Sequence, residues 1–351
     1  MKKAKVIMLA PDLNVQGGIS SVVQEYLKAN LDQKVDLIFL PTHQDGSAGK
    51  KISIFLKALA RFLRLTPQMR TTIVHLHTSQ NGSFVRKFIL FFIARVAGAR
   101  TIVHIHGSKF DGFMKRNRLL RFLTKYYFDH ADRILVTFPF WKNILADYTN
   151  NKNIFVFYNP ISLSAEPYQV NGTLNILFLG RLGQRKGVYD LLTCISQNKE
   201  YFARKGARFI LAGDGEVSQV RQFVRDHQLE GFVEVPGWIL GDAKEAYWKS
   251  SDLLILPSYH EQMPMSILEA MAHGYPIIAT NVAGIPEMVK HCENGYLFAP
   301  GDIRAMTFYL RQLCDHSALR EKMGQKSQEL VREKFANTKI VDQLVSMYED
   351  F

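Results

Sequence analysis

The sequence predicts an α/β protein made of two Rossmann-like domains, each with a parallel sheet covered by helices on both faces. Short apolar or β-branched runs alternate with longer helical patterns along the whole chain, which is typical of parallel sheets. The 351 residues, 47% of them hydrophobic and 22% charged, suffice for about two domains. The polar stretch from Asn159 to Gly172 is the clearest linker. We therefore expect two sheets that face a cleft, with ligands at the carboxyl ends of the strands.

The predicted strands form two series, one on each side of this linker. The first series is Lys5–Ala10, Val35–Leu40, Thr72–His77, Thr101–His106, Arg133–Thr137 and Ile154–Tyr158. The second series is Leu174–Leu179, Arg208–Ala212, Phe232–Val235, Leu253–Leu256, Pro276–Ala279 and Gly295–Phe298. We place an N-terminal domain at residues 1–165, a C-terminal domain at 166–335, and a C-terminal helix that crosses back to the N-terminal domain at 336–351.

Several classes of protein do not fit this composition. It is that of an ordinary globular chain, not of a disordered one. The longest apolar run, Phe88–Ala94, is far shorter than the roughly 20 residues that cross a bilayer. Residues 1–10 fit a first strand better than a signal sequence. Three cysteines without a close pair argue against a disulfide framework and favour a cytoplasmic location.

Positive charge is concentrated in the first half of the chain. Residues 1–165 carry 24 Lys and Arg against nine Asp and Glu, an excess of +15, whereas the remainder carries 20 against 23. Such a surface attracts nucleic acid, anionic lipid or a phosphorylated substrate, or is basic without a partner. No nucleic-acid recognition motif is present, so we expect no nucleic-acid partner.

In each predicted domain, a glycine-containing loop follows the first strand. Gly17 and Gly18 precede a helical pattern, where a backbone can approach an anion at a helix N-terminus or simply turn. The loop from Gly180 to Gly187 carries Arg181 and Lys186. These two cations can neutralise a diphosphate leaving group. The alternative is a surface turn with solvated cations; the spacing does not match a P-loop.

Two glutamates follow the strand Leu253–Leu256. Glu261 lies in the loop before a predicted helix, and Glu269 lies eight residues later, within that helix. Carboxylates at these places can accept hydrogen bonds from sugar hydroxyls and from a ribose diol. The alternative, an amphipathic helix with two exposed acids, does not explain why Glu261 stands beside a strand end.

These motifs together resemble the family 4 (GT4) glycosyltransferases. The matching segments are Gly17-Gly18-Ile19, Gly180-Arg181-Leu182 with Lys186-Gly187, Pro257-Ser258 with Glu261 and Glu269-Ala270-Met271-Ala272, and Ala279 to Glu287. The resemblance covers essentially the whole chain and implies a GT-B fold with a nucleotide-sugar donor. It implies that Arg181 and Lys186 bind the donor diphosphate, Glu261 the sugar and Glu269 the ribose. It also implies that Gly17 and Gly18 approach the donor phosphate or sugar across the cleft.

The resemblance also implies nucleobase contacts at Trp238 and Ile239, which follow the strand Phe232–Val235. One segment departs from the family pattern: Gln262-Met263-Pro264 stands where the family commonly has Gly-Phe-Gly. Pro264 has no N–H to donate. We place Met263 at the donor, as in polysaccharide-assembly members of the family.

Two His-x-His pairs end neighbouring predicted strands, His75 with His77 and His104 with His106. Period 2 places each pair on one face, where four imidazoles could hold a metal. The resembling family needs no metal, so we predict none and no cofactor. The resemblance places His106 in the active site, whereas His75 and His104 are expected to be satisfied core histidines.

Two basic segments of the first half have neighbouring apolar residues. Residues 50–65 form an amphipathic helix with Ile52, Phe55, Leu56, Leu59, Phe62 and Leu63 on one face and Lys50, Lys57, Arg61 and Arg64 opposite. The second segment carries Lys115, Arg116, Arg118 and Arg121. Such helices suit an anionic membrane surface, although packing of the apolar face on the domain's own sheet is the alternative.

The sequence thus predicts a retaining, metal-independent hexosyltransferase. Its donor would be a UDP- or GDP-linked sugar and its acceptor a lipid-linked glycan, in capsule, exopolysaccharide or O-antigen assembly at the inner face of the cell membrane. The alternatives are a nucleotide-sugar epimerase or related GT-B enzyme, and a non-catalytic nucleotide-binding membrane scaffold.

Overall fold

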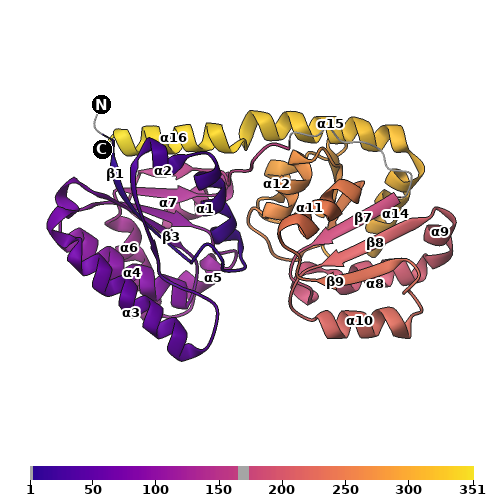
Figure 1. Cartoon of the computed structure of the whole chain (residues 1–351), viewed down its shortest axis with the longest axis horizontal. Coiled ribbons are helices and arrows are strands. Elements are labelled where there is room, and N and C mark those ends of the chain that lie inside the picture. Colours follow the sequence, from indigo (N-terminus) through magenta and orange to yellow (C-terminus); the bar gives the residue numbers. More distant parts are fainter. Residues whose placement is uncertain (1–2, 165–173) are drawn as a thin grey trace. The chain divides into compact units, whose positions relative to one another are not determined.

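The computed structural model describes residues 3–164 and 174–351, whose strands form two six-stranded parallel sheets (Figure 1). The chain divides into two compact units. Unit 1 comprises Met1–Ser162 with Phe335–Phe351, and unit 2 comprises Leu163–Lys334. The predicted α/β class with two parallel sheets is confirmed. The predicted boundary between residues 165 and 166 lies outside the described residues.

Unit 1 is built on a sheet whose strand order is β2-β1-β3-β4-β5-β6. Its strands are β1 (Lys5–Ala10), β2 (Asp36–Pro41), β3 (Ile73–Thr78), β4 (Arg100–Ile105), β5 (Arg133–Val136) and β6 (Ile154–Val156). Every neighbouring pair is parallel. The central strands β1 and β3 are buried along almost their whole length, and β1 is a nearly continuous apolar run, as expected of a strand covered on both faces. The strand order reverses between β1 and β3, which is where open α/β sheets bind ligands.

Helices cover the sheet of unit 1 on both faces. They are α1 (Gly18–Lys28), α2 (Leu31–Lys34), α3 (Ala48–Arg64), α4 (Gly82–Val96), α5 (Phe110–Lys115), α6 (Arg118–Asp129), α7 (Pro139–Tyr148) and α16 (Asn337–Glu349), with a 3₁₀ turn η1 (Thr66–Thr71). Aromatic side chains dominate the core between the sheet and α4 to α6, where the Tyr127 ring meets Phe84 and Phe91 edge to face. Such contacts are favourable for aromatic rings.

Unit 2 has the strand order β12-β11-β10-β7-β8-β9. Its strands are β7 (Leu174–Leu179), β8 (Ala207–Ala212), β9 (Val233–Gly237), β10 (Leu253–Leu256), β11 (Ile277–Thr280) and β12 (Gly295–Phe298). Counted from β7, this is the order of the doubly wound dinucleotide-binding sheet. The order reverses between β7 and β10, which pair in parallel through Leu253 opposite Ile176.

The helices of unit 2 follow its strands in the same alternation (Figure 1). They are α8 (Val188–Gln197), α9 (Lys199–Arg204), α10 (Val217–Asp226), α11 (Gly241–Ser250), α12 (Met265–Ala272), α13 (Ile285–Met288), α14 (Ile303–Asp315) and α15 (Ser317–Lys334), with a 3₁₀ turn η2 (Gln184–Lys186). Helix α12 is buried at all but one of its positions, so its sequence is apolar rather than amphipathic.

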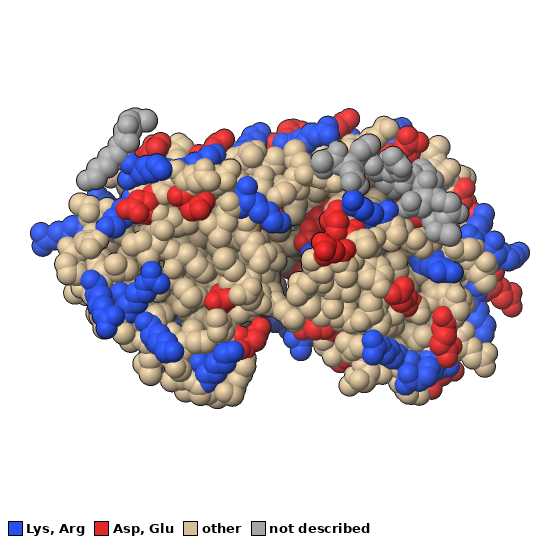
Figure 2. Space-filling view, viewed as in Figure 1, with Lys and Arg blue, Asp and Glu red and all other residues tan. Residues whose placement is uncertain are grey.

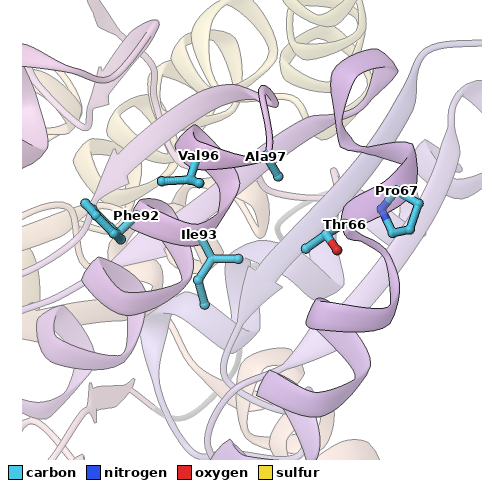
Figure 3. Close-up of a pocket in the computed structure, with 6 residues that line it drawn as sticks. All are labelled: Thr66, Pro67, Phe92, Ile93, Val96 and Ala97. Carbon is cyan, nitrogen blue, oxygen red and sulfur yellow. The ribbon is translucent and has the colours of Figure 1, made fainter.

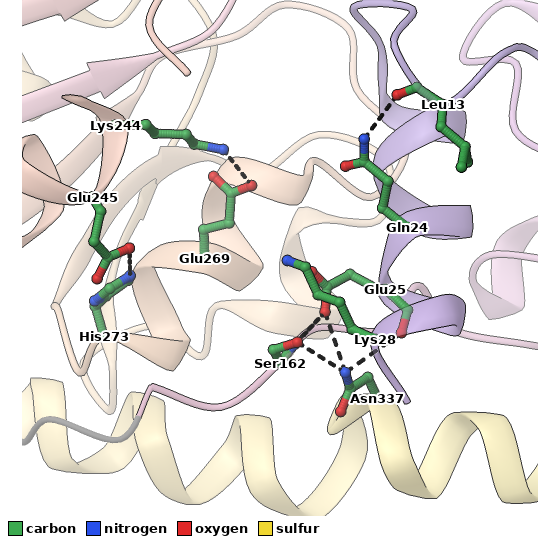
Figure 4. A network of polar contacts seen from close by, with 10 residues as sticks. All are labelled: Leu13, Gln24, Glu25, Lys28, Ser162, Lys244, Glu245, Glu269, His273 and Asn337. Atoms are coloured by element: carbon green, nitrogen blue, oxygen red, sulfur yellow. Dashed lines mark hydrogen bonds and ion pairs between the residues drawn. The ribbon is translucent and has the colours of Figure 1, made fainter. Parts of the chain in front are cut away.

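The C-terminal helix α16 belongs to unit 1, where it packs against α1 and α2. A polar cluster fixes its first turn (Figure 4). The buried carboxylate of Glu25 on α1 accepts hydrogen bonds from the N–H and the hydroxyl of Ser162, at 2.6 and 2.5 Å. The Asn337 amide donates to the Ser162 hydroxyl at 2.9 Å and to the Glu25 carboxylate at 3.3 Å. One carboxylate therefore joins three segments that are far apart in sequence.

We expect Glu25→Ala to destabilise unit 1 by about 2–3 kcal/mol, because buried donors of Ser162 and Asn337 lose a charged acceptor. The measurement is the calorimetric unfolding transition of the full chain. Asp32→Ala, an exposed acid on α2, is the control and should leave the transition unchanged. Equal transitions in both variants would contradict the role given to Glu25.

Candidate functional site

The strongest candidate site lies where the loops after β7 and β10 meet, beside the reversal of strand order in unit 2. Gly187 adopts φ +70°, and a Cβ there would lie 2.0 Å from the carbonyl oxygen of Pro257. Gly213, after β8, is equally constrained, because its Cβ would lie 1.8 Å from the carbonyl oxygen of Gly180. Only glycine allows these approaches. The glycines of the motif therefore bring three strand-end loops into contact.

A buried ion pair joins the first two of these loops. The Lys186 ammonium contacts the Glu261 carboxylate, and their side chains are only 12% and 8% exposed. The structure thus brings together two residues that the sequence placed 75 positions apart. The expectation that Lys186 is a solvated cation on an exposed loop is wrong, because the close approach at Gly187 encloses its side chain.

Two exposed arginines flank this pair. Arg181 is 65% exposed, and its guanidinium lies 3.4 Å from the Asp214 carboxylate. Such an exposed, long contact holds the side chain weakly, so Arg181 is free to reorient toward an anion. Arg185, which the sequence analysis missed, donates a hydrogen bond to the His260 carbonyl at 3.0 Å and so orders the loop before Glu261.

Glu269, on the second turn of α12, has a cation partner that sequence reasoning also missed. The Lys244 ammonium on α11 lies 2.8 Å from its carboxylate (Figure 4). Lys244 is part of an ordinary polar helix and belongs to no motif. Only the packing of α11 beside α12 could have revealed it.

The other predicted donor residues differ in exposure. Trp238 follows β9 and is exposed, whereas Ile239 and Met263 are buried. Pro264 is the N-cap of α12, so its missing N–H leaves no intrahelical bond unmade. The carbonyl of Gln262 accepts a hydrogen bond from Gly284 N–H at 3.0 Å, which ties this loop to the one after β11.

In unit 1, Gly17 and Gly18 are exposed at the start of α1. The backbone of Asp12 holds this loop, because its carbonyl accepts a hydrogen bond from the Ser20 hydroxyl at 2.9 Å. The first turn of α1 contains no acidic side chain, so its N–H groups and dipole favour an anion there.

The four histidines of β3, β4 and the residue after β4 form one cluster. The His77 and His106 rings are joined by a hydrogen bond of 2.9 Å between Nδ1 and Nε2. His75 Nδ1 lies 2.6 Å from the Tyr348 hydroxyl on α16. Burial lowers the pKa of both His75 and His106 to about 3, so these imidazoles are neutral near pH 7.

His104 is not the satisfied core histidine that the sequence predicted. Within residues 3–164 and 174–351, neither of its buried nitrogens has a hydrogen-bond partner. Ligand nitrogens of His75, His77 and His104 lie within 4.8 Å of one another, close enough to hold a metal ion. The rings of His75 and His77 stack with an angle of 22° between their planes. The expectation that no metal binds there stays a prediction.

The basic segments of unit 1 lie beside uncovered apolar surface. On α3, Phe62 is buried and Phe55 and Leu59 pack partly on the core, but Ile52 and Leu56 remain 60% and 56% exposed. The alternative, in which the apolar face of α3 packs on the domain's own sheet, is therefore only partly right, because part of that face is exposed. On α4, Val85, Ile89, Phe92 and Val96 form a second exposed stripe.

Cations border these stripes. Lys50, Lys57, Arg61 and Arg64 on or beside the polar face of α3 are exposed. So are Lys115, Arg116, Arg118 and Arg121, which accompany the exposed Leu119 and Phe122 of α6. Over the α3–α4 region, Figure 2 shows Lys and Arg side chains around uncharged surface. No helix in the described part of the chain has the length and apolarity that a membrane span needs.

An apolar hollow of about 490 Å³ lies at the end of the α4 stripe. It is lined by Phe92, Ile93, Val96 and Ala97 of α4 and by Thr66 and Pro67 of η1 (Figure 3). The hollow therefore extends the exposed apolar surface of α4 onto η1.

The fold and the strand-end residues together define a two-domain protein of the GT-B class. Two family models match successive parts of the chain: "Glycosyl transferase 4-like domain" over residues 30–160 and "Glycosyl transferases group 1" over residues 173–316. The chain belongs to the GT4-type glycosyltransferases, and its resemblance to that family is confirmed.

Two curated relatives illustrate the range of the family. The chain is 26% identical to the UDP-Gal:alpha-D-GlcNAc-diphosphoundecaprenol alpha-1,3-galactosyltransferase of Escherichia coli, over 97% of this chain and 89% of that one. It is 37% identical to the N-acetyl-alpha-D-glucosaminyl L-malate synthase of Bacillus anthracis over 41% of this chain. That alignment spans only 38% of the relative's own length.

Solved structures agree on the fold. A sucrose-phosphate synthase from Thermosynechococcus elongatus superposes with a TM-score of 0.81 at 17% identity, covering 99% of this chain and 98% of that one. HepE of Anabaena in complex with UDP-glucose superposes with a TM-score of 0.76, also at 17% identity, covering 99% and 100%.

The buried ion pair predicts an asymmetry between single and double substitutions. Lys186→Met should lower the free energy of unfolding of unit 2 by about 3–5 kcal/mol, because Glu261 is left as a buried charge without its partner. Adding Glu261→Gln should recover much of this loss. Chemical denaturation of the single and double variants, with Arg181→Met as an exposed control, measures the difference. Additive losses would contradict the pairing.

Proposed function

We propose that the protein is a retaining hexosyltransferase that moves a sugar from a UDP- or GDP-linked donor to a lipid-linked glycan acceptor. The observation that carries this proposal is the enclosed Lys186–Glu261 pair at the strand reversal of unit 2, with Arg181 exposed beside it. A cation and a carboxylate held together in this way present one group for phosphate and one for sugar hydroxyls. The pathway we propose is capsule, exopolysaccharide or O-antigen assembly.

The donor assignment rests on charge and on the relatives. Arg181 and Lys186 would together neutralise the negative charge that develops on the leaving diphosphate, which is often the largest catalytic contribution. Glu261 would then exchange its lysine partner for donor-sugar hydroxyls, and Glu269 would accept from the ribose. Trp238, Ile239 and Met263 would complete the donor pocket. A complex of HepE with UDP-glucose and the activity for which the E. coli galactosyltransferase is named support a nucleotide-sugar donor.

For the reaction we propose front-face attack, in which the departing phosphate accepts the acceptor proton and the anomeric configuration is retained. No metal is needed in this scheme, because the two cations stabilise the leaving group. His106 would act as a neutral imidazole, since burial lowers its pKa to about 3. It would orient a hydroxyl rather than supply a positive charge. Gly17 and Gly18 would offer backbone N–H groups to the donor.

For the acceptor we propose a lipid-linked glycan presented at the inner face of the cell membrane. The exposed apolar stripes of α3 and α4 with bordering cations fit an anionic interface. The E. coli relative acts, by its name, on a diphosphoundecaprenol-linked sugar. An epimerase and a non-catalytic scaffold are the competing functions.

Arg181→Ala and Lys186→Ala should each lower turnover at least tenfold, because each removes a charge that stabilises the leaving diphosphate. Arg181→Ala should keep wild-type stability, so its loss can be attributed to chemistry. Lys142→Ala, an exposed cation of unit 1, is the charge-matched control. The assay is release of nucleoside diphosphate with and without acceptor.

Four outcomes would contradict the proposal. Wild-type turnover in both variants would exclude the assigned donor site. Conversion of the donor sugar without acceptor would indicate an epimerase, whereas nucleotide binding without any conversion would indicate the scaffold. A chemical step that stops on chelation and returns with added Mg²⁺ or Mn²⁺ would contradict the metal-free scheme.

The membrane proposal predicts salt-sensitive binding of the full chain to vesicles that contain anionic lipid. Each Lys or Arg near such a surface contributes on the order of 1 kcal/mol, and the field decays over about 8 Å at physiological salt. Charge reversal at Lys50, Lys57, Arg61 and Arg64 should reduce co-sedimentation strongly. The double variant Ile52→Ser with Leu56→Ser should reduce the part of the vesicle binding that persists at high salt. Equal binding to neutral and anionic vesicles would contradict the electrostatic contribution.

A further inference from the structure

Unit 1 contains a buried lysine that the proposed reaction does not use. Lys87 on α4 is 1% exposed, and its ammonium has one hydrogen-bond partner among the described residues, the Thr42 hydroxyl at 2.5 Å. That hydroxyl donates its own proton to the Ala10 carbonyl at 3.1 Å, so it faces Lys87 purely as an acceptor. Two of the three ammonium N–H groups are therefore left without an acceptor there.

A second cation lies beside Lys87, and no acid balances the two. Burial lowers the pKa of Lys87 to about 7, and the positive charge of Arg86 contributes to this shift. The Arg86 guanidinium is half-buried, and its Nε has no partner. Within residues 3–164 and 174–351, no carboxylate lies within ion-pair distance of Arg86 or Lys87. Buried charges in proteins are normally paired, so this pair is incomplete as it stands.

His43 extends the cluster toward the surface. Its partial burial is the main cause that lowers its pKa; the positive charges of Arg86 and Lys87 lower it further, whereas Asp45 raises it. Its Nδ1 is buried without a partner, while its Nε2 lies 3.8 Å from Asp45 at the exposed end of the loop. The cluster therefore brings one imidazole and two cations together, and among the described residues the Thr42 hydroxyl is the acceptor for Lys87.

The position of the cluster in the sheet matches a ligand site. Thr42 and His43 follow β2, and Arg86 and Lys87 lie in the second turn of the helix that follows β3. These segments flank the carboxyl end of β1, beside the reversal of strand order in unit 1. The cluster also lies in the unit that carries the apolar stripes of α3 and α4, which we propose contact the membrane.

We propose that Lys87, Arg86 and His43 form an anion pocket that binds the phosphate groups of a lipid-diphosphate acceptor. This proposal rests on the proposed function, because it names the anchor of the acceptor in that reaction. Arg binds phosphate oxygens bidentately and Lys adds a point charge. A diphosphate would supply the missing counter-charge and the acceptors for the unpaired N–H groups. The Thr42 hydroxyl orients the ammonium of Lys87.

The test uses the full chain, saturated with UDP so that the donor site is occupied. Calorimetric titration with inorganic pyrophosphate and with geranyl diphosphate should show one further binding event. Lys87→Met, which keeps the side-chain volume, and Arg86→Gln should each weaken both ligands at least tenfold. Lys142→Met is the matched loss of one exposed charge and should change neither. The affinity for UDP should stay within twofold in all variants.

Thermal unfolding distinguishes a binding role from a structural one. Lys87→Met should unfold at the wild-type temperature or above, because an incompletely paired buried charge is removed. Addition of pyrophosphate should raise the unfolding temperature of wild type more than that of Lys87→Met. A lower unfolding temperature with unchanged ligand affinity would make Lys87 a structural residue and overturn the proposal.

The remaining outcomes are also decisive. Pyrophosphate binding without geranyl diphosphate binding would exclude the lipid acceptor as the source of the anion. If Lys142→Met weakens anion binding as much as Lys87→Met does, the effect is one of net charge, and the pocket is overturned. UDP binding without any second anion would overturn the pocket while the donor proposal stands. Failure to bind UDP and GDP alike would overturn the donor proposal, and the pyrophosphate titration of wild type and Lys87→Met would still report on the pocket.

Discussion

The ion pair between Lys186 and Glu261 is the interaction on which the candidate site depends. Its two residues lie on loops that follow β7 and β10, which are neighbours only because the strand order of unit 2 reverses between them. The pair is enclosed because Gly187 lets one loop touch the other. A buried pair of this kind contributes little net stability compared with apolar residues of the same volume. Its enclosure is therefore better explained by use than by stability.

Unit 1 handles buried polar groups in a different way. Its four histidines avoid charge altogether, because burial lowers the pKa values of their imidazoles, and repulsion from neighbouring histidines adds to this at His75, His77 and His104. Lys87 and Arg86 retain the capacity for charge but have no acid beside them. Unit 2 thus supplies a counter-ion for its buried lysine, whereas unit 1 leaves the position of the counter-ion open. That contrast is the physical basis for assigning an anion to unit 1.

The exposed surface of unit 1 reflects the number of apolar residues on its helices. Helices α3 and α4 each bury one side against the sheet, and each has more apolar residues than that side can hold. The surplus forms the exposed stripes and the hollow at η1. A helix that only covered its sheet would place polar residues there. The surplus of exposed apolar residues therefore indicates a contact surface, whereas the excess of positive charge alone does not.

The sequence by itself determined the fold class and the strands. Alternation of apolar runs with helical patterns located every strand of both sheets to within two residues, because strands buried on both faces are nearly continuous apolar runs. It also located the residues of the strand-end loops, because glycines and charged residues in those loops form recognisable motifs.

Tertiary structure alone decided how those residues are paired. Lys244 beside Glu269, Lys186 enclosed against Glu261, and Lys87 against Thr42 each join segments that no local pattern connects. Tertiary structure also decided that, among the described residues, neither nitrogen of His104 has a hydrogen-bond partner. Local sequence determines which face a side chain points to, since the periods of helix and strand are fixed. Whether that side chain then meets an ion partner, another cation or water depends on strand order and helix packing, which are global properties of the chain.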